Sequence, residues 1–247
     1  MQRKGIVVVT GAAGGIGQGI VARLAQDGYT VAALDISNDR LQETVGALTG
    51  PGHRAYLCDQ TNEMQTRDVI NQIESQMGEI EGLVNVTGWV GATRFEDETA
   101  DYWRKVVAIN FEALLFVVHP ILKHMIPRKR GKMVFIASDA GRVGTSTEAV
   151  YAGMKAGVIA FAKSLARENA RYALNFNCVS PGPTETPLLA KEIEDNPDIV
   201  GRMTRLIPFR RIGKPSDQAA AVSFLLSPDA DYITGQTLSV SGGLTMI

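Results

Sequence analysis

The sequence has few of the residues that mark several common classes of protein. It contains 2 cysteines and 3 histidines among 247 residues. Cys58 and Cys178 each lie in an apolar stretch, and their spacing fits neither a disulfide framework nor a metal site. We therefore expect two buried thiols and no bound metal. The formal net charge of −1 provides no strong basic field, so nucleic acid is not an expected partner.

Long apolar runs are also missing. No stretch approaches the length of about 20 apolar residues that a membrane-spanning helix needs. A strand pattern begins at Ile6, which leaves no room for a signal peptide. These absences indicate a cytoplasmic protein with no membrane partner. The chain is 45% hydrophobic, enough for one large α/β domain or two small ones.

Short apolar runs alternate with helical patterns along the chain. The first unit is strand 6–9, a glycine-rich turn, a helix to about residue 27 and strand 30–34. The alternation continues with helix 38–48, strand 54–58, helix 63–77, strand 83–86, helix 99–128, strand 133–137, helix 150–171, strand 175–179, helix 215–226 and strand 237–240. This pattern predicts an α/β fold: a Rossmann-type, doubly wound parallel sheet of about seven strands, in a single domain spanning residues 1–247.

Two stretches depart from this simple alternation. Helix 99–128 is long, and we expect two segments that meet near Asn110. Residues 181–208 are rich in proline and charge and are longer than an ordinary connection. We therefore expect a substrate lid at about residues 183–214.

Gly11, Gly15 and Gly17 lie between the first strand and the first helix. Backbone N–H groups at a helix start bind anions, and glycine lets a pyrophosphate approach closely. Asp35 ends the second strand, where a carboxylate accepts hydrogen bonds from ribose hydroxyls and repels a 2′-phosphate. The pattern predicts a dinucleotide site that favours NAD over NADP. A helix-capping role for Asp35 stays open beside this one.

Ser138, Tyr151 and Lys155 form a second constellation. Ser138 follows an apolar run and so lies at the carboxyl end of a buried strand, where open parallel sheets bind ligands. Tyr151 and Lys155 share one face of a predicted helix. A lysine ammonium lowers the pKa of a nearby phenol, and such a tyrosine exchanges a proton with an alcohol or ketone. This spacing is also common in helices that have no catalytic role.

At this point the chain resembles the short-chain dehydrogenase/reductase family over nearly its whole length. The resemblance rests on four motifs: Thr10-Gly11-x3-Gly15-Ile16-Gly17, Asn85-Val86-Thr87-Gly88, the Ser138–Tyr151–Lys155 set, and Pro181-Gly182-Pro183-Thr184-Glu185-Thr186. The second motif departs from the family's usual Asn-Asn-Ala-Gly at its two central residues. Pro183 has no N–H to donate in the last motif, whereas Thr184 and Thr186 do.

The resemblance implies roles for particular residues. Asn110, Ser138, Tyr151 and Lys155 match the four catalytic positions, and Asp59 matches an adenine contact. Tyr151 would take the substrate proton, Ser138 would bind the substrate oxygen, and Asn110 would hold a water. The implied cofactor-binding residues are Gly11, Gly15, Ile16, Gly17, Asp35, Ile36, Cys58, Asp59, Gln60, Asn85, Gly88, Tyr151, Lys155, Pro181, Gly182, Thr184 and Thr186.

Three stretches narrow the resemblance: residues 136–144, 148–151 and 238–246. They are similar to NAD-dependent enzymes of anaerobic aromatic degradation that oxidise a hydroxyl β to a CoA thioester. Examples are 2-hydroxycyclohexanecarbonyl-CoA and 2-(hydroxy(phenyl)methyl)succinyl-CoA dehydrogenases. Similar stretches occur in 3-oxoacyl-(acyl carrier protein) reductases, so that activity stays open. So do an NAD-dependent dehydrogenase of a small alcohol or polyol, and a non-catalytic NAD-binding subunit.

Candidates for the substrate side are Trp89, Arg94, Asp139 and Arg142. Trp89 would wall the pocket, and either arginine would bind a carboxylate or phosphate; structural roles stay open for these side chains. Further basic residues in and after the lid are candidates for the CoA phosphates: Arg202, Arg205, Arg210, Arg211 and Lys214. The resemblance also implies a tetramer, made of identical subunits or including a related one.

Overall fold

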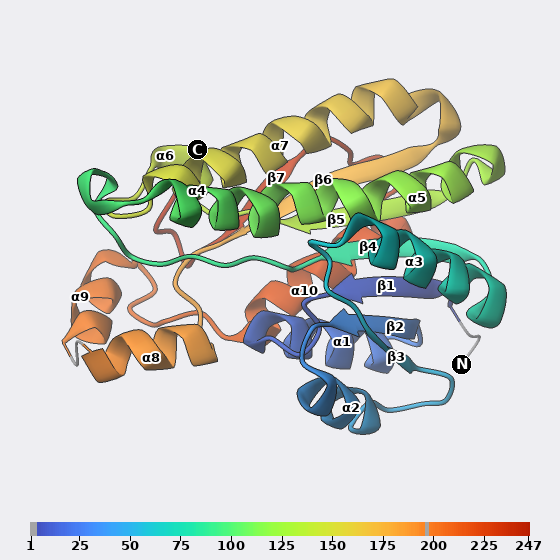
Figure 1. Ribbon diagram of the computed structural model, residues 1–247, viewed down its shortest axis with the longest axis horizontal. Coiled ribbons are helices and arrows are strands. Elements are labelled where there is room, and N and C mark those ends of the chain that lie inside the picture. The colour runs from blue at the N-terminus through green and yellow to red at the C-terminus, as the bar shows by residue number, and fades with distance from the viewer. Residues whose placement is uncertain (1–3, 196–197) are drawn as a thin grey trace.

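Seven parallel strands form one sheet in the computed structural model, which describes residues 4–195 and 198–247 (Figure 1). The order across the sheet is β3-β2-β1-β4-β5-β6-β7. Strand order therefore reverses between β1 and β4, which is where doubly wound sheets bind ligands. The predicted doubly wound parallel sheet is confirmed. The strands are β1 (Ile6–Thr10), β2 (Thr30–Asp35), β3 (Arg54–Leu57), β4 (Ile80–Asn85), β5 (Gly131–Ile136), β6 (Leu174–Pro181) and β7 (Thr237–Val240).

Helices cover both faces of the sheet (Figure 1). On one face lie α1 (Gly15–Gln26), α2 (Asn38–Gly46) and α10 (Pro215–Leu226). On the other lie α3 (Glu63–Met77), α5 (Ala113–Arg128) and α7 (Ala149–Asn169). The strands read as continuous apolar runs because both of their faces are buried.

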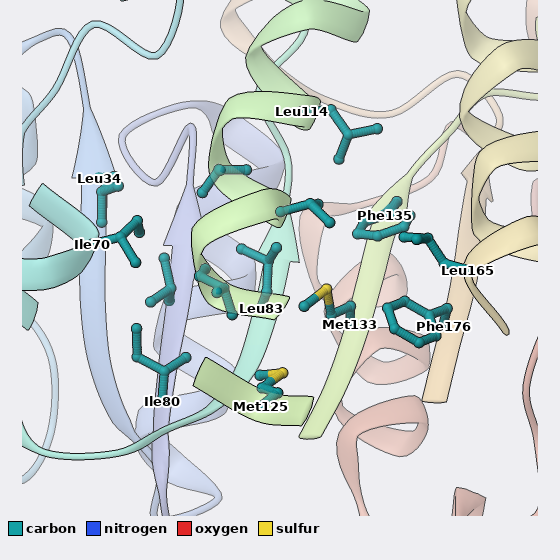
Figure 2. Packing of buried hydrophobic residues seen from close by; sticks show 14 of the residues in the cluster. Leu34, Ile70, Ile80, Leu83, Leu114, Met125, Met133, Phe135, Leu165 and Phe176 are labelled. Carbon is teal, nitrogen blue, oxygen red and sulfur yellow. The ribbon is translucent and has the colours of Figure 1, made fainter. Parts of the chain in front are cut away.

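The core on the α3–α5–α7 face is the larger of the two shared by strands and helices. Phe135 of β5 and Phe176 of β6 are diagonal neighbours on adjacent strands in it, with Leu114 of α5 above them and Leu165 of α7 beside them (Figure 2). Val134 and Ile136 alternate with Phe135 and point into the opposite core. Each such side chain contributes about 1.5–3 kcal/mol when fully buried.

The predicted joint near Asn110 is a π-helical turn, Ala108–Glu112, between α4 (Ala100–Val107) and α5. By length and composition alone, residues 100–128 would also suffice to cross a membrane. However, 44% of their most apolar window is buried in the fold, and α5 contributes its apolar side chains to the core. We interpret this stretch as a core helix.

The segment 183–214 contains two helices that the sequence did not predict, α8 (Pro187–Asp195) and α9 (Ile199–Leu206). They project beside the carboxyl ends of the strands (Figure 1). Pro187 is tolerated because it opens its helix. The two ends of the segment meet, since Gly213 N–H donates to the Pro183 carbonyl at 2.9 Å. Further short elements are α6 (Ala140–Val143), η1 (Phe95–Asp97), η3 (Ala170–Tyr172) and η4 (Pro228–Ala230).

Gly17 permits the tight turn between β1 and α1. A Cβ there would lie 2.1 Å from the Gly11 carbonyl oxygen, and this backbone atom cannot swing aside as a side chain does. We predict that Gly17→Ala destabilises the protein by about 1–3 kcal/mol and lowers its melting temperature by several degrees. Gly46→Ala is the matched control, because a Cβ at Gly46 meets nothing within 4 Å. Thermal unfolding followed by circular dichroism compares the two. Equal melting temperatures would contradict the steric argument.

Candidate active site

The carboxyl ends of the strands surround a cavity of about 870 Å³. The structure brings to it every residue predicted for the catalytic, cofactor and substrate sites, apart from Asn85, Arg94, Asn110, Arg142 and the five basic residues proposed for the CoA phosphates. The glycine turn, Asp35 and Asp59 line one part of the cavity, and Ser138 and Tyr151 line another. One elongated site therefore joins the two constellations predicted from the sequence.

The glycine turn forms a side-chain-free wall of this cavity. Gly11 adopts a φ of +60°, and a Cβ there would lie 3.0 Å from the Thr87 backbone nitrogen. A Cβ on Gly15 would lie 3.0 Å from side-chain atoms of Thr186 and Pro187. The turn leads directly into α1, so backbone N–H groups and the positive end of the helix dipole lie at this wall. Such a wall fits the phosphates of a dinucleotide.

Asp35 is held in place by two backbone donors. Its Oδ2 accepts the Ala13 N–H at 2.9 Å and its Oδ1 accepts the Ser37 N–H at 3.0 Å. The carboxylate therefore spans the ends of β1 and β2 while keeping free lone pairs for ribose hydroxyls. Arg40, which the sequence analysis did not select, also lines the cavity, and its Nη2 donates to the Ala13 carbonyl at 2.6 Å.

Ser138 and Tyr151 are joined by a hydrogen bond between their hydroxyl groups. Ser138 follows β5, and its Oγ also accepts the Ala140 N–H at 3.1 Å. Lys155 lies one turn along α7 from Tyr151, with its Nζ 5.6 Å from the centre of the phenol ring. That Nζ donates to the Ile136 carbonyl at 2.9 Å, and the side chain is 3% exposed. The predicted shared helix face is confirmed.

The net pKa shift of Tyr151 is upward, whereas the sequence led us to expect a downward shift. Burial raises the pKa of the Tyr151 phenol to about 12; the Ser138 hydrogen bond opposes this rise and the Glu148 carboxylate adds to it. Burial also lowers the pKa of the Lys155 ammonium to about 8. Desolvation is the largest cause of both shifts, because Lys155 is buried and Tyr151 is partly buried.

Asn110 and Asn85 lie behind the cavity wall. The Asn110 amide donates to the carbonyls of Trp89 at 2.7 Å and Val106 at 2.9 Å, and its Oδ1 accepts the Trp89 N–H at 3.1 Å. The Thr10 hydroxyl donates to Asn85 Oδ1 at 3.0 Å, which joins the ends of β1 and β4. Both amide hydrogens of Asn110 are engaged, so the side chain has no donor left for a water, and the backbone groups are the remaining donor and acceptor beside one Oδ1 lone pair.

The two predicted substrate arginines have protein partners and do not line the cavity. Arg94 pairs with Glu96 at 2.8 Å on the exposed surface. Arg142 donates to the Ser239 hydroxyl at 2.6 Å, and Ser239 donates to Asp139 Oδ1 at 2.7 Å. Asp139 does line the cavity, and this network ties it to β7.

Trp89 lies in the cavity wall, as the sequence suggested. The Lys105 ammonium stands 3.8 Å from the centre of its ring, and the Tyr102 ring lies 5.6 Å away. A cation over an indole face is attracted by the ring quadrupole. Lys105 and Tyr102 thus hold the position of the indole, which lines the site.

Several lining residues were missed from the sequence, among them Thr145, Glu148, Leu189, Met203 and Leu244. Leu189 and Met203 come from α8 and α9. Leu244 reaches the cavity because the Gly242–Gly243 turn, with both φ values positive, bends the chain end back. No local pattern marks these positions, since each depends on how distant segments pack.

A strand–glycine turn–helix unit facing a Ser–Tyr–Lys set is the arrangement of nicotinamide-dependent oxidoreductases. A family model described as enoyl-(acyl carrier protein) reductase matches residues 11–245. The chain belongs to this family of short-chain dehydrogenase/reductases, as the sequence motifs predicted.

Relatives with known names are similar over their full length. A human (3R)-3-hydroxyacyl-CoA dehydrogenase is 34% identical over 257 residues, covering 99% of this chain and 97% of the relative. A 3-oxoacyl-(acyl carrier protein) reductase of Chlamydia pneumoniae is 33% identical over 241 residues, covering 97% and 96%. The crystal structure of a single-residue variant of actinorhodin polyketide ketoreductase with NADPH has a TM-score of 0.93 at 32% identity, covering 98% of this chain and 97% of that one.

Proposed function

We propose that the protein oxidises a secondary hydroxyl to a ketone with NAD, and that its substrate is a β-hydroxyacyl-CoA thioester. The acyl group would be cyclic or aromatic, from the anaerobic degradation of aromatic compounds. The observation that supports this activity most directly is that Ser138, Tyr151 and Lys155 line the same cavity as the glycine turn and Asp35. The similarity of residues 136–144 to dehydrogenases of that pathway supports the choice of substrate.

The lining residues fit a nicotinamide dinucleotide. The glycine turn at the start of α1 would bind the phosphates through its backbone N–H groups, and Asp35 offers acceptors to the adenosine ribose. Lys155 would hold the second ribose. The Thr184 hydroxyl is engaged within the protein, since it donates to the Gly182 carbonyl at 2.9 Å. The backbone N–H groups of Thr184 and Thr186 are therefore the better donors for the nicotinamide carboxamide.

When bound, the nicotinamide ring supplies the acceptor for the hydride that leaves the carbinol carbon. The chain's own residues manage the proton. Tyr151 Oη accepts the hydroxyl proton, and Ser138 Oγ hydrogen-bonds the same oxygen as it becomes a carbonyl. Lys155, when protonated, stabilises the phenolate. A water on the Asn110 backbone would connect Lys155 to solvent.

NAD is the proposed cofactor because of Asp35. Two backbone N–H groups hold its carboxylate at the adenosine end, so it cannot turn away from a 2′-phosphate. Like charges in such proximity repel strongly when partly buried. Arg40 is the nearest base and donates to the Ala13 carbonyl. Because a similar ketoreductase structure contains NADPH, the assay must compare NAD with NADP.

Reduction of a 3-oxoacyl thioester in fatty-acid synthesis is the second candidate. The reductase from Chlamydia pneumoniae and the NADPH-bound ketoreductase favour it. Asp35 argues against it, because biosynthetic reduction usually draws on NADPH. A non-catalytic subunit is disfavoured because all four catalytic positions of the family are filled.

The proposal extends to a cytoplasmic tetramer and a lid. Residues 183–214 would act as the lid, since their ends are tied at Gly213 while Leu189 and Met203 reach the cavity. Packing of α5 and α7 between subunits would cover an apolar hollow that includes Phe116 and Phe161.

The first experiment measures NADH production with hydroxyacyl-CoA thioesters, the matching free acids and simple alcohols, using NADP as the control cofactor. We predict activity with thioesters and NAD. Tyr151→Phe should keep NAD affinity and lower kcat by a factor of about 100 or more, because proton transfer is lost. Activity on free alcohols alone would remove the thioester substrate. Undiminished turnover by Tyr151→Phe would remove the mechanism.

The pKa values set the sign of the pH dependence. Tyr151, with a pKa of about 12, is protonated at neutral pH, and oxidation needs its phenolate. We predict that kcat/KM for oxidation rises about tenfold per unit between about pH 6 and pH 8. The rise should flatten above the Lys155 pKa of about 8, where the ammonium is lost. Ketone reduction needs the neutral phenol and should stay level over that range. A level oxidation profile would exclude Tyr151 as the proton acceptor.

Lid arginines would bind the CoA nucleotide. Arg202 and Arg205 lie exposed on α9, which also places Met203 in the cavity wall, and no described residue pairs with either guanidinium group. Arg211, by contrast, pairs with Asp217 at 2.6 Å. We predict that the double change Arg202→Ala, Arg205→Ala raises KM for a CoA thioester about tenfold. KM for the N-acetylcysteamine thioester, which lacks the nucleotide, should not change.

Arg54→Ala is the charge control, since Arg54 is exposed at the amino end of β3, on the opposite edge of the sheet. Steady-state kinetics with both thioesters make the comparison. Equal effects on the two thioesters would show that the arginines act on the lid itself. If the native protein turns over neither thioester, the proposed substrate is refuted.

A further inference from the structure

Gln218 is a buried polar side chain on the mostly apolar inner face of α10. It is 0% exposed, and Ala219 and Val222 of the same helix belong to the hydrophobic core. Its Nε2 donates to the Val240 carbonyl at 2.9 Å and to the Thr184 hydroxyl at 3.2 Å. One amide group therefore connects α10 to the end of β7 and to the turn that follows β6.

The partners of Gln218 fix the direction of these hydrogen bonds. A backbone carbonyl only accepts, so the amide nitrogen and not the amide oxygen must face Val240. That nitrogen is only a donor, so the Thr184 hydroxyl accepts its second hydrogen. The hydroxyl proton then goes to the Gly182 carbonyl at 2.9 Å. Gln218 thus orients the Thr184 side chain, which closes the turn from Gly182 to Thr184.

This turn lies at the cavity wall and at the base of the segment 183–214. Pro183 and Thr184 both line the cavity. Gly213, at the other end of the segment, donates its N–H to the Pro183 carbonyl at 2.9 Å. A Cβ on Gly213 would lie 3.6 Å from Gln218 Nε2, so the amide also lies close to that end. Gln218 is therefore placed where both ends of the segment meet the cavity.

Stability alone does not explain an amide at this position. Gln218 Oε1 is buried, and no described residue donates a hydrogen bond to it. A buried acceptor without a donor destabilises a fold, whereas an apolar side chain of the same shape would avoid that cost. Methionine has the length of glutamine and no amide. The two hydrogen bonds of Nε2 therefore point to a role in orienting the turn.

We propose that Gln218 is a positioning residue for the nicotinamide end of the cofactor, and that it acts through the Thr184 hydroxyl on the turn after β6. The backbone N–H of Thr184 is a proposed donor to the nicotinamide carboxamide. A turn that is fixed before binding loses less conformational entropy when the carboxamide arrives. The inference rests on the proposed binding of a nicotinamide dinucleotide, and it holds for either such cofactor and for any substrate.

The test compares NADH with ADP-ribose, which lacks nicotinamide, by isothermal titration calorimetry. Gln218→Met should weaken NADH binding by a factor of about 5, the size of one net hydrogen bond, and leave the affinity for ADP-ribose unchanged. Thr184→Val removes the other partner of the same bond and should have the same effect. The double variant should bind NADH as tightly as either single variant, because the two residues act as a unit. Turnover at saturating cofactor should also fall, because the ring is less well aligned.

Ser223→Ala is the matched control. Ser223 is another buried polar residue of α10, and its hydroxyl donates to the Asp27 carboxylate. Neither of these residues lines the cavity. The control therefore removes a buried hydrogen bond from the same helix without touching the turn after β6, and it should leave both affinities unchanged.

Two results would overturn the proposal. One is a Gln218→Met variant that binds NADH as tightly as the native protein does. The other is a variant that weakens NADH and ADP-ribose by the same factor, because a general loosening of the fold predicts that result. If Gln218→Met fails to fold, Thr184→Val decides by the same two criteria, since it leaves α10 intact. A native protein that binds neither ligand would refute the dinucleotide site itself, which is a different result from a loss confined to the variants.

Discussion

A buried hydroxyl at the end of β1 holds the site together. Thr10 is fully buried; its hydroxyl donates to Asn85 and accepts the N–H groups of Val86 at 3.1 Å and Thr87 at 3.3 Å. These bonds join β1 to β4 at the point where the strand order reverses. The loop after β4 begins there and continues to Trp89, whose backbone N–H donates to Asn110 Oδ1. The glycine turn and the wall opposite it thus share one anchor.

Burial governs the chemistry of the site as well as its shape. Tyr151 and Lys155 lie where the sheet and α7 exclude water, and each therefore favours its neutral form relative to a solvated group. The hydrogen bonds of Lys155 to Ile136 and of Ser138 to Ala140 hold the geometry in place. These hydrogen bonds fix the positions of the side chains, and desolvation makes their pKa values depend strongly on nearby charges.

Local pattern was a good guide wherever one element decides the outcome. The glycine turn between β1 and α1, the acid that ends β2 and the Tyr151–Lys155 helix face were each recognised from the position of a residue within or next to one element. The pattern failed where partners come from afar. Arg142 looked like a ligand-binding arginine because Ser239, its actual partner, lies on β7. The helices α8 and α9 were missed because their apolar positions pack mainly on Ile207 and Ile212, within a segment whose proline and charge content suggested a loop.

By itself, the sequence determined the parallel sheet and the glycine turn, and it selected the Ser138, Tyr151 and Lys155 side chains that line the cavity. Strand burial on both faces and glycine geometry leave few other arrangements for these residues. Only the tertiary structure decided the sign of the pKa shifts and the polar partners of Asn110, Arg94 and Arg142. It also decided the hydrogen bond between Thr87 and Gln60. Desolvation and hydrogen-bond partnership depend on which distant segments close around a group, and spacing along the chain does not encode them.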